Sequence, residues 1–498
     1  MGRIRLRVVL GCILVGMVAV PGAEASHQTN RRFGPEGTIV DADHGDDDVA
    51  VGGVENDTLQ GPTRNDTLDG TSGSDDDGGS GRDACPAGTS CGRAGGCLPR
   101  WAEDESTGIG TAMEGAIESV TAVDLTGDGR DEAVVVRMIF QTTRTFPIDL
   151  IAADGTGGLE WATDRLFDGA VPTTQHPVPP VIADFNGDGV DDIFIPDSGM
   201  DADPFPGYQN QLVLSVPGGR VVNATDGLPQ QRDQTHRAAA ADVDGDGDVD
   251  LFVANLGGQG GEPSQIWLND GDGGFRIAEG LLPPAQVDLF QNWYTSVGFV
   301  DADGDGDPDL VLGQGDAAKH SHVLRNDGTG RFTKVPEDLP TTPLWPSVHV
   351  LYLQAVEIDG DGLDDLVLAH TRLSYVGRYF QVLISNGDGT FRDETAARLP
   401  QSSLDSAAWP RYLVPVDVNY DGYLDVIAYL LGGQPLFYLN GGDGTFSQWD
   451  PGIDLWEWAF MDVNGDGRRD IVNSYSANPG ISDYEFHLAA PETACLVP

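Results

Sequence analysis

A nine-residue acidic motif that recurs seven times is the strongest constraint on the fold of this 498-residue chain. The copies start at residues 124, 184, 242, 301, 357, 417 and 462, so consecutive starts lie 60, 58, 59, 56, 60 and 45 residues apart. Apolar segments precede the copies, and β-branched segments such as "LFVA" after Asp250 follow them, which is typical of buried strands. Such even spacing indicates a repeat architecture.

Each repeat of about sixty residues accommodates about four short strands, which is the content of one propeller blade. Later repeats contain a further strand and a Gly-rich turn, as in "VLRNDGTGRF" over residues 323–332. A closed ring lets every blade bury both faces. We therefore predict an all-β fold, a seven-bladed β-propeller of four-stranded antiparallel blades over residues 101–498, whose last blade borrows a strand from the N-terminal side. Sandwich and solenoid arrangements are the alternatives.

The motif carries oxygen ligands at the spacing of the first half of a calcium loop. Positions 1, 3 and 5 bear oxygen side chains, position 6 is always Gly, position 9 is always acidic, and position 7 varies freely. We expect position 7 to offer its backbone carbonyl. An EF-hand is excluded because none of the copies has Glu at position 12. Ordinary polar Asp-Gly turns are the alternative.

The predicted ligand sets, in chain order, are Asp124, Thr126, Asp128, Arg130 and Glu132; Asp184, Asn186, Asp188, Val190 and Asp192; Asp242, Asp244, Asp246, Asp248 and Asp250; Asp301, Asp303, Asp305, Asp307 and Asp309; Glu357, Asp359, Asp361, Leu363 and Asp365; Asp417, Asn419, Asp421, Tyr423 and Asp425; and Asp462, Asn464, Asp466, Arg468 and Asp470. The third and fourth sets carry the most carboxylates and should bind most tightly. The first, with Thr126, and the sixth, with Tyr420 at position 4, should bind least tightly.

The motif "DxDGDGxxD" followed by "NDGDGTF"-type turns resembles the FG-GAP and VCBS repeat families and is similar to the propeller of integrin α-subunits. The resemblance implies calcium in the hairpin loops of one face. It also implies that ligands bind the opposite face or the clefts between blades. Integrin propellers carry such loops in only some blades, whereas here each of the seven repeats has one.

The N-terminal residues indicate export. Residues 1–25 read as a signal peptide, with a basic start, an apolar stretch over residues 8–20 and "AEA" before the expected cleavage point. Residues 26–82 are Gly- and Asp-rich, and a nonapeptide echo over residues 52–78 resembles the calcium repeats of secreted RTX proteins. That segment is expected either to bind further calcium or to act as a flexible acidic linker.

The cysteines suggest a staple between the two ends of the ring. After export four remain, namely Cys85, Cys91 and Cys97 in a lead-in over residues 83–100, and Cys495 near the C-terminus. We expect Cys495 to pair with one of the first three, with a second, local disulfide between the other two. A zinc site is disfavoured because no second close Cys pair is present.

A formal charge of −51 argues against nucleic acid and anionic membranes as partners and favours cations. No later segment is long and apolar enough for a transmembrane helix. The expected function is a secreted or cell-surface, monomeric module for binding or adhesion. It would hold up to seven calcium ions in the propeller and bind an extracellular glycan or protein. A propeller-based polysaccharide lyase or glycoside hydrolase is the alternative, although the sequence shows no recognisable catalytic motif.

Overall fold

The computed structural model describes residues 114–476 with short gaps (156–157, 257–261, 285–292, 373–374, 401–406, 453–454, 456, 464 and 466–468). Outside this range it describes the backbones of β1 to β9 and of β38. The chain divides into two compact units, residues 1–84 and 85–498. Each unit is described separately below.

The second unit consists mainly of four-stranded antiparallel sheets. Six of these sheets use consecutive stretches of chain. Their strands are β10 (Ala116–Val123), β11 (Glu132–Met138), β13 (Asp149–Ala153) and β14 (Leu159–Trp161); β16 (Val181–Ala183), β17 (Asp192–Ile195), β18 (Gln211–Val216) and β19 (Arg220–Asn223); β20 (Thr235–Ala241), β21 (Asp250–Asn255), β22 (Gln265–Asn269) and β23 (Phe275–Ala278); β24 (Tyr294–Val300), β25 (Asp309–Gln314), β26 (His322–Asn326) and β27 (Phe332–Asp338); β28 (Val348–Val356), β29 (Asp365–Arg372), β30 (Val376–Ser385) and β31 (Phe391–Asp393); and β32 (Trp409–Val416), β33 (Asp425–Leu431), β34 (Leu436–Asn440) and β35 (Phe446–Trp449).

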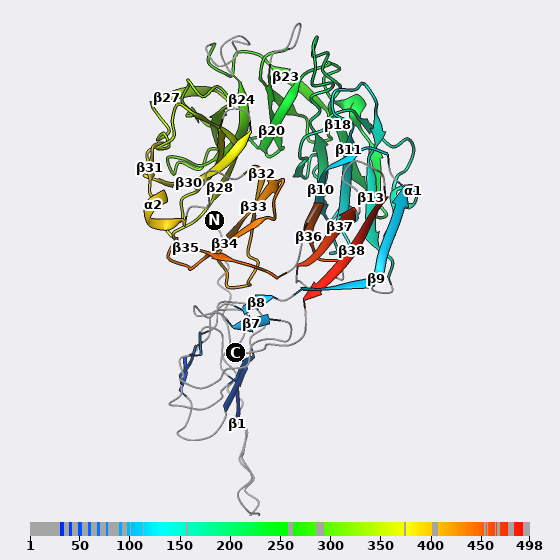
Figure 1. Ribbon diagram of the computed structural model, residues 1–498. Helices are drawn as coiled ribbons and strands as arrows, with labels where there is room; N and C mark the ends of the chain where they lie inside the picture. The colour runs from blue at the N-terminus through cyan, green and yellow to red at the C-terminus, as the bar shows by residue number, and fades with distance from the viewer. Residues whose placement is uncertain are drawn as a thin grey trace, which may run out of the picture. The chain divides into compact units, whose positions relative to one another are not determined.

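The seventh four-stranded sheet joins the two ends of the unit. It contains β36 (Glu457–Met461), β37 (Asp470–Ser476), β38 (Asp483–Pro491) and β9 (Trp101–Ala112). β9 pairs antiparallel with β38, from Ala112 opposite Asp483 to Trp101 opposite Pro491. Figure 1 shows β9 in cyan beside β38 in red. The expectation that the last blade borrows an N-terminal strand is therefore confirmed.

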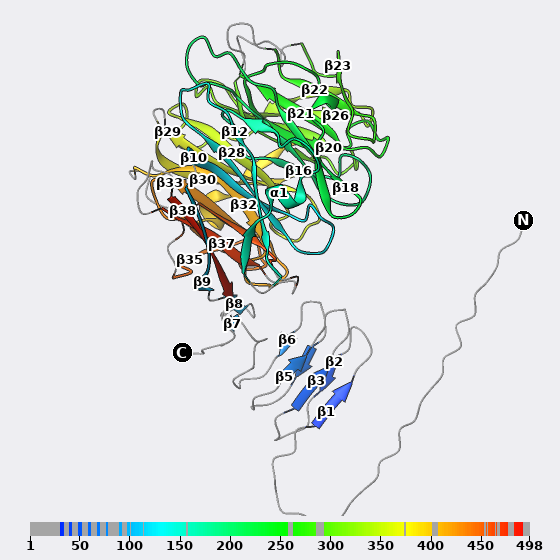
Figure 2. The ribbon, with the colours of Figure 1, turned by 90° about the vertical axis from the view of Figure 1, so that its right-hand side faces the viewer.

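Apolar packing between blades holds the ring together. The described residues form seven clusters of buried apolar side chains, and each cluster is shared by two neighbouring sheets. Trp267 of β22, for example, meets Phe194 of β17 edge to face at a centroid distance of 5.9 Å. Val472 of β37 belongs to the same cluster as Ile117 of β10, which closes the ring. The predicted class, a β-propeller of four-stranded antiparallel blades, is confirmed (Figures 1 and 2).

Short elements fill the connections between these strands. They are α1 (Thr163–Leu166), α2 (Thr395–Arg398), the 3₁₀ turn η1 (Thr225–Gly227), and the paired β12 (Phe146–Pro147) and β15 (Thr173–Thr174). In an antiparallel blade, the first and third connections lie at one edge and the second lies at the other. The acidic motifs are first connections, so they share one face, which we call the loop face. The other side is the opposite face.

Two short strands, β7 and β8, precede the propeller strands. β7 (Thr89–Cys91) pairs with β8 (Cys97–Pro99) and places Cys91 opposite Cys97. Cys85 and Cys495 lie outside the described residues, so the disulfide staple stays a prediction.

The first unit contains six short parallel strands at intervals of about nine residues. β1 (Asn30–Phe33), β3 (Asp48–Val51) and β5 (Thr67–Asp69) form one sheet, which Figure 2 shows side by side. β2 (Ile39–Asp41), β4 (Thr58–Gln60) and β6 (Asp76–Asp77) form a second. The turns between them lie outside the described residues, so RTX-like calcium binding over residues 52–78 stays a prediction.

Candidate metal loops

The carboxylate at position 1 accepts hydrogen bonds from backbone N–H groups further along its own loop and so stabilises the turn. In the third loop, Asp242 accepts the backbone N–H groups of Gly245 (2.8 Å) and Gly247 (2.9 Å), one on each carboxylate oxygen. Asp124, Asp301 and Glu357 accept the equivalent pairs in their loops. Gly247, at position 6, has a φ of 97°, a backbone conformation that residues with a Cβ atom rarely adopt. The invariant Gly is therefore required by the turn, as the sequence predicted.

The carboxylate at position 9 links the loop to the neighbouring strand of the sheet by hydrogen bonds. Asp250 is buried and accepts N–H groups from Val243 (3.1 Å) at position 2 and from Asn269 (2.8 Å) at the end of β22. Asp365 and Asp425 accept the equivalent pairs. Burial raises the pKa of Asp250 to about 7 in the metal-free loop. A divalent cation beside such a carboxylate would stabilise its ionised form.

Positions 1, 3 and 5 converge in the third, fourth and fifth loops. Ligand oxygens lie within 4.8 Å of one another in three groups, namely Asp242, Asp244 and Asp246; Asp301, Asp303 and Asp305; and Glu357, Asp359 and Asp361. In each group one oxygen of the position 3 carboxylate (Oδ1 of Asp244, Asp303 and Asp359) is buried and has no hydrogen-bond partner. A buried acceptor without a donor is costly. These residues therefore fit a hard, oxygen-seeking divalent cation such as calcium, and calcium would supply the missing partner.

Arginine side chains compete for position 3 in two of these loops. Arg325 Nε lies 2.8 Å from Asp303, and Arg398 Nη2 lies 2.9 Å from Asp359. Asp244 has no such ion pair among the described residues. The sequence reasoning missed these arginines because they lie in β26 and α2, some twenty to forty residues from the acids they contact. The third loop should accordingly be the one that binds a cation with least competition.

The remaining loops differ at position 3. The Thr126 hydroxyl donates weakly to Glu132 (3.5 Å), Asn186 accepts the N–H of Asp188 (3.0 Å), and Asn419 donates to Asp421 (2.9 Å). Burial raises the pKa of Glu132 to about 8. Asn464, Asp466 and Arg468 of the seventh loop lie outside the described residues. The ligand roles predicted for these loops stay predictions.

Position 7 contacts its loop through the backbone N–H group, and the carbonyl ligand expected there stays a prediction. The backbone N–H groups of Arg130, Val190, Asp248, Asp307, Leu363 and Tyr423 each donate to the position 5 carboxylate of their loop, at 2.9 to 3.0 Å. The side chain of Tyr423 is exposed and packs over Gly442 of the neighbouring hairpin. The contact of position 7 with the loop is thus made by the backbone.

An asparagine at the end of the third strand links neighbouring blades. Asn269, Asn326 and Asn440 are buried, and each donates its side-chain amide to the position 2 carbonyl of the preceding blade's loop, namely Phe185 (2.9 Å), Val243 (2.8 Å) and Ile358 (3.1 Å). The sequence analysis interpreted "NDG" only as a turn signal. The recurrence of Asn directly before the turn was the sequence signal for this hydrogen bond between blades.

The opposite face carries most of the exposed aromatic side chains among the described residues. These are Phe140, Phe205, Trp293, Trp345 and Tyr375, whereas Tyr420 and Tyr423 lie on the loop face. Trp345 is 40% exposed and stacks on His320 with a centroid distance of 4.9 Å. Solvent-exposed aromatic rings on one face are typical of binding surfaces.

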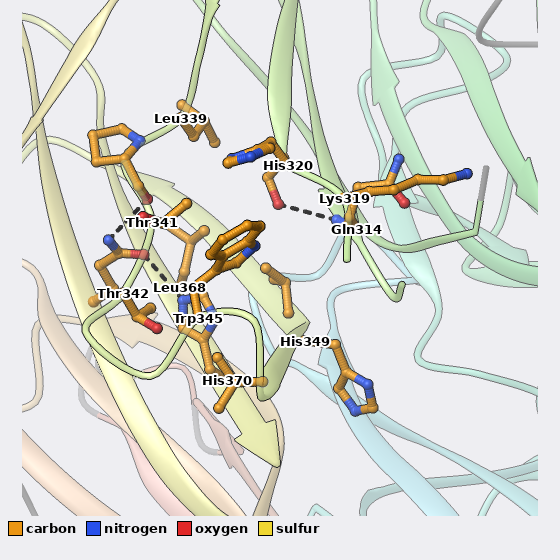
Figure 3. Close-up of a pocket in the computed structure, with 15 residues that line it drawn as sticks. Gln314, Lys319, His320, Leu339, Thr341, Thr342, Trp345, His349, Leu368 and His370 are labelled. Carbon is orange, nitrogen blue, oxygen red and sulfur yellow. Dashed lines mark hydrogen bonds between the residues drawn. The ribbon is translucent and has the colours of Figure 1, made fainter. Parts of the chain in front are cut away.

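A small cavity lies behind this ring pair, between the fourth and fifth blades. Figure 3 shows His320, Trp345 and His370 on its walls. The amide oxygen of buried Gln381 accepts a hydrogen bond from His370 Nε2 (3.1 Å), and its amide nitrogen donates to the carbonyl of Pro340 (3.0 Å), which fixes the imidazole. The cavity is only about 30 Å³, enough for about one water molecule. A ligand would therefore contact the exposed ring surface rather than enter the cavity.

Comparisons with known proteins agree with the repeat reading. Residues 242–312, 301–368 and 357–428 each match the FG-GAP-like repeat family. No curated protein matches the chain. Among the helices that the structure describes, none has the length and apolar character needed to cross a membrane. The chain is therefore a β-propeller, and residues 242–428 of it match FG-GAP-like repeats.

Proposed function

We propose that this protein is a secreted, calcium-stabilised binding module that presents its opposite face to an extracellular glycan or protein. The observation that supports calcium most directly is the convergence of three carboxylates in each of the third, fourth and fifth loops, each with an unpartnered buried oxygen. The resemblance of residues 1–25 to a signal peptide supports export. Extracellular calcium is plentiful enough to fill even weak sites.

Calcium has a structural role in this proposal. An ion that binds the folded loop and not the unfolded chain stabilises the fold by RT ln(1 + [Ca²⁺]/Kd). With Kd on the order of 10⁻⁴ M and calcium on the order of 10⁻³ M, each site contributes about 1.4 kcal/mol. Several occupied loops together would contribute a large share of a domain's net stability.

Chelation tests this role. The calcium-loaded protein should melt at a clearly higher temperature than the same protein after dialysis against a chelator, and returning calcium should restore the higher value. Asp244→Asn should reduce the calcium-dependent shift more than Asp248→Asn, because only Asp244 converges on the proposed ion. Equal melting temperatures with and without calcium would disprove a structural role for the ion.

The exposed rings of the opposite face are the proposed ligand surface. Aromatic rings stack on the apolar faces of sugars and supply most of the binding energy at protein interfaces. A glycan array and an extracellular-protein panel would identify the class of ligand. Trp345→Ala should reduce binding at least tenfold, whereas Tyr423→Ala, an equally exposed ring on the loop face, should leave it unchanged. The reverse result would place the ligand on the loop face.

A further inference from the structure

In five blades the first strand, which is the innermost, carries a β-bulge at the same position along the strand. The first strands of neighbouring blades contact one another at five of the seven junctions (β10 with β36, β16 with β20, β20 with β24, β24 with β28, and β28 with β32), so these strands line the centre of the ring. Pairing skips one residue in five of them, and each skipped residue lies five positions before the one that pairs with position 9. These residues, which we call the bulge belt, are Glu118, His236, Thr295, Leu351 and Arg411. Bulges re-aim side chains and are common next to binding sites.

Charged side chains lie in the bulge belt and directly beside it. Arg411 of the sixth blade forms an ion pair with Glu118 of the first. Arg237, the neighbour of His236, donates to the carbonyls of His236 (2.7 Å) and Leu351 (3.4 Å), and its Cζ lies 5.3 Å from the centre of the Tyr352 ring. Its Nε is buried without a hydrogen-bond partner. No carboxylate of the described residues forms an ion pair with Arg237.

The groups around Arg237 act on its pKa in opposite directions. Burial is the largest effect that lowers the pKa of Arg237, and the charge of Arg411 acts in the same direction, against Glu118 and the hydroxyls of Tyr352 and Tyr375. Burial also lowers the pKa of His236 well below its usual value, so at neutral pH its imidazole is uncharged. His236 therefore adds no charge beside Arg237.

Open space adjoins the bulge belt. Two cavities of about 390 and 280 Å³ both border Pro179, Pro180 and Tyr352. Arg237 lines the first and Tyr412 lines the second. Neither is lined by Asp or Glu, although 79 of the chain's 498 residues are acidic. The channel thus offers a cationic, aromatic-walled site of small-ligand size inside a strongly anionic protein.

We propose that the channel beside the bulge belt binds a ligand carboxylate at Arg237, with the rings of Tyr352 and Tyr412 against the apolar part of the ligand. A guanidinium fork matches the two oxygens of a carboxylate, which would give the buried Nε of Arg237 a partner. The carboxylate belongs either to an acidic sugar or to an acidic amino-acid side chain. This site goes beyond the proposed calcium-dependent function, because its chemistry and its location are independent of the loops.

Calorimetric titration of the full-length, calcium-loaded protein at low salt tests the site with three probes. Galacturonate and N-acetylglutamate carry the carboxylate on different frameworks, and galactose is the neutral control. We expect at least one of the two acids to bind, galactose not to bind, and binding to weaken as sodium chloride is added. Binding of galacturonate alone assigns an acidic sugar, and binding of N-acetylglutamate alone assigns an acidic side chain. Binding of both assigns recognition of the carboxylate itself.

Variants then locate the site. Arg237→Gln should weaken binding of the acid at least tenfold, and Arg237→Lys, which keeps the charge but loses the fork, should weaken it less. Arg165→Gln, in the exposed α1, is the matched control and should bind like the parent protein. If neither acid binds the parent protein, if galactose binds equally well, or if Arg237→Gln binds normally, the proposal is wrong. None of these results depends on whether chelation lowers the melting temperature. The carboxylate site and the structural role of calcium can therefore be disproved independently of each other.

Discussion

At the level of single residues, repetition revealed which positions matter but not what each one contacts. Comparing seven copies identified positions 1, 3, 5, 6 and 9, and the structure gives the loops their expected turn at Gly247. The position 9 carboxylate was predicted only as a ligand. It also accepts two backbone N–H groups, one of them from a strand about twenty residues away, as in Asp250 and Asn269. Contacts of this range depend on blade geometry, which a single sequence does not specify.

The arginine at the fourth loop should weaken calcium binding there. Removing it in Arg325→Gln frees Asp303, so calcium affinity at this loop should rise by up to about tenfold, although the pair is partly exposed and screened. Calcium should therefore raise the melting temperature of the variant by more than that of the parent. Arg331→Gln, an exposed arginine of the same blade, is the control and should not change the calcium response. An unchanged or smaller response of Arg325→Gln would show that the ion pair does not compete.

A buried acid away from the loops should give the fold a measurable pH dependence. Asp197 is fully buried and accepts N–H groups from Gln175 (2.6 Å), His176 (2.9 Å) and Gly199 (2.8 Å), yet burial raises its pKa to about 6. Because the folded pKa lies above the unfolded value of about 3.9, the contribution to stability is present at low pH and is lost as the pH rises through about 6.

Comparison with the neutral variant Asp197→Asn isolates the contribution of Asp197 ionisation to the free energy of unfolding. The stability of the parent protein relative to Asp197→Asn should fall by roughly 1–3 kcal/mol between pH 4 and pH 7. Urea denaturation of both proteins at constant calcium gives the difference directly. A difference that is constant, or that grows with pH, would mean that the three N–H groups outweigh burial.

At the level of elements, the strands and loops followed from the sequence and the contacts between blades did not. Apolar, β-branched segments predicted the strands, and the even period predicted their grouping into blades. The asparagines before the "DG" turns were interpreted locally, although Asn326 reaches across to Val243 of the preceding blade. In the fifth blade Ser385 occupies this position, and the N–H of Gly389 contacts the carbonyl of Ala302 instead (3.0 Å). The blade interface therefore keeps the bond while changing the donor.

Loss of one of these asparagines should destabilise the ring. Asn326→Ala leaves the buried carbonyl of Val243 without this donor, so the free energy of unfolding should fall by about 1–3 kcal/mol. Asn386→Ala, whose exposed side chain bonds Thr390 and Arg392 of its own hairpin and no neighbouring blade, should change it by less than about 0.5 kcal/mol. Denaturant titration of both variants at saturating calcium checks this. Equal effects would mean that the contact between blades contributes nothing specific.

At the level of the whole molecule, the sequence predicted the ring and the structure shows how it closes. Six blades use consecutive strands, and the last sheet is completed by β9. The bulge belt had no signal in a single sequence, because a bulge depends on strand register. His236 and Arg411 are not part of any motif, and they face one channel only because their strands are arranged around it.

Removal of β9 should open the ring. A chain beginning at residue 113 exposes the edge of β38, so it should melt at a lower temperature and associate through that edge. A chain beginning at residue 85, which lacks only the first unit, is the control and should keep the melting temperature of the propeller. Light scattering and calorimetry would distinguish the two. A stable, monomeric chain from residue 113 would show that β9 is dispensable.

The composite sheet also affects when the chain can fold during its synthesis. Ala112 pairs with Asp483, a partner 371 residues later (483 − 112). The first strand of the ring therefore waits, unpaired, until residue 483 has been made. Contacts of such long sequence separation form slowly. A chain exported from its N-terminus would keep an open ring until β38 had crossed, so the propeller could be completed only on the far side of the membrane.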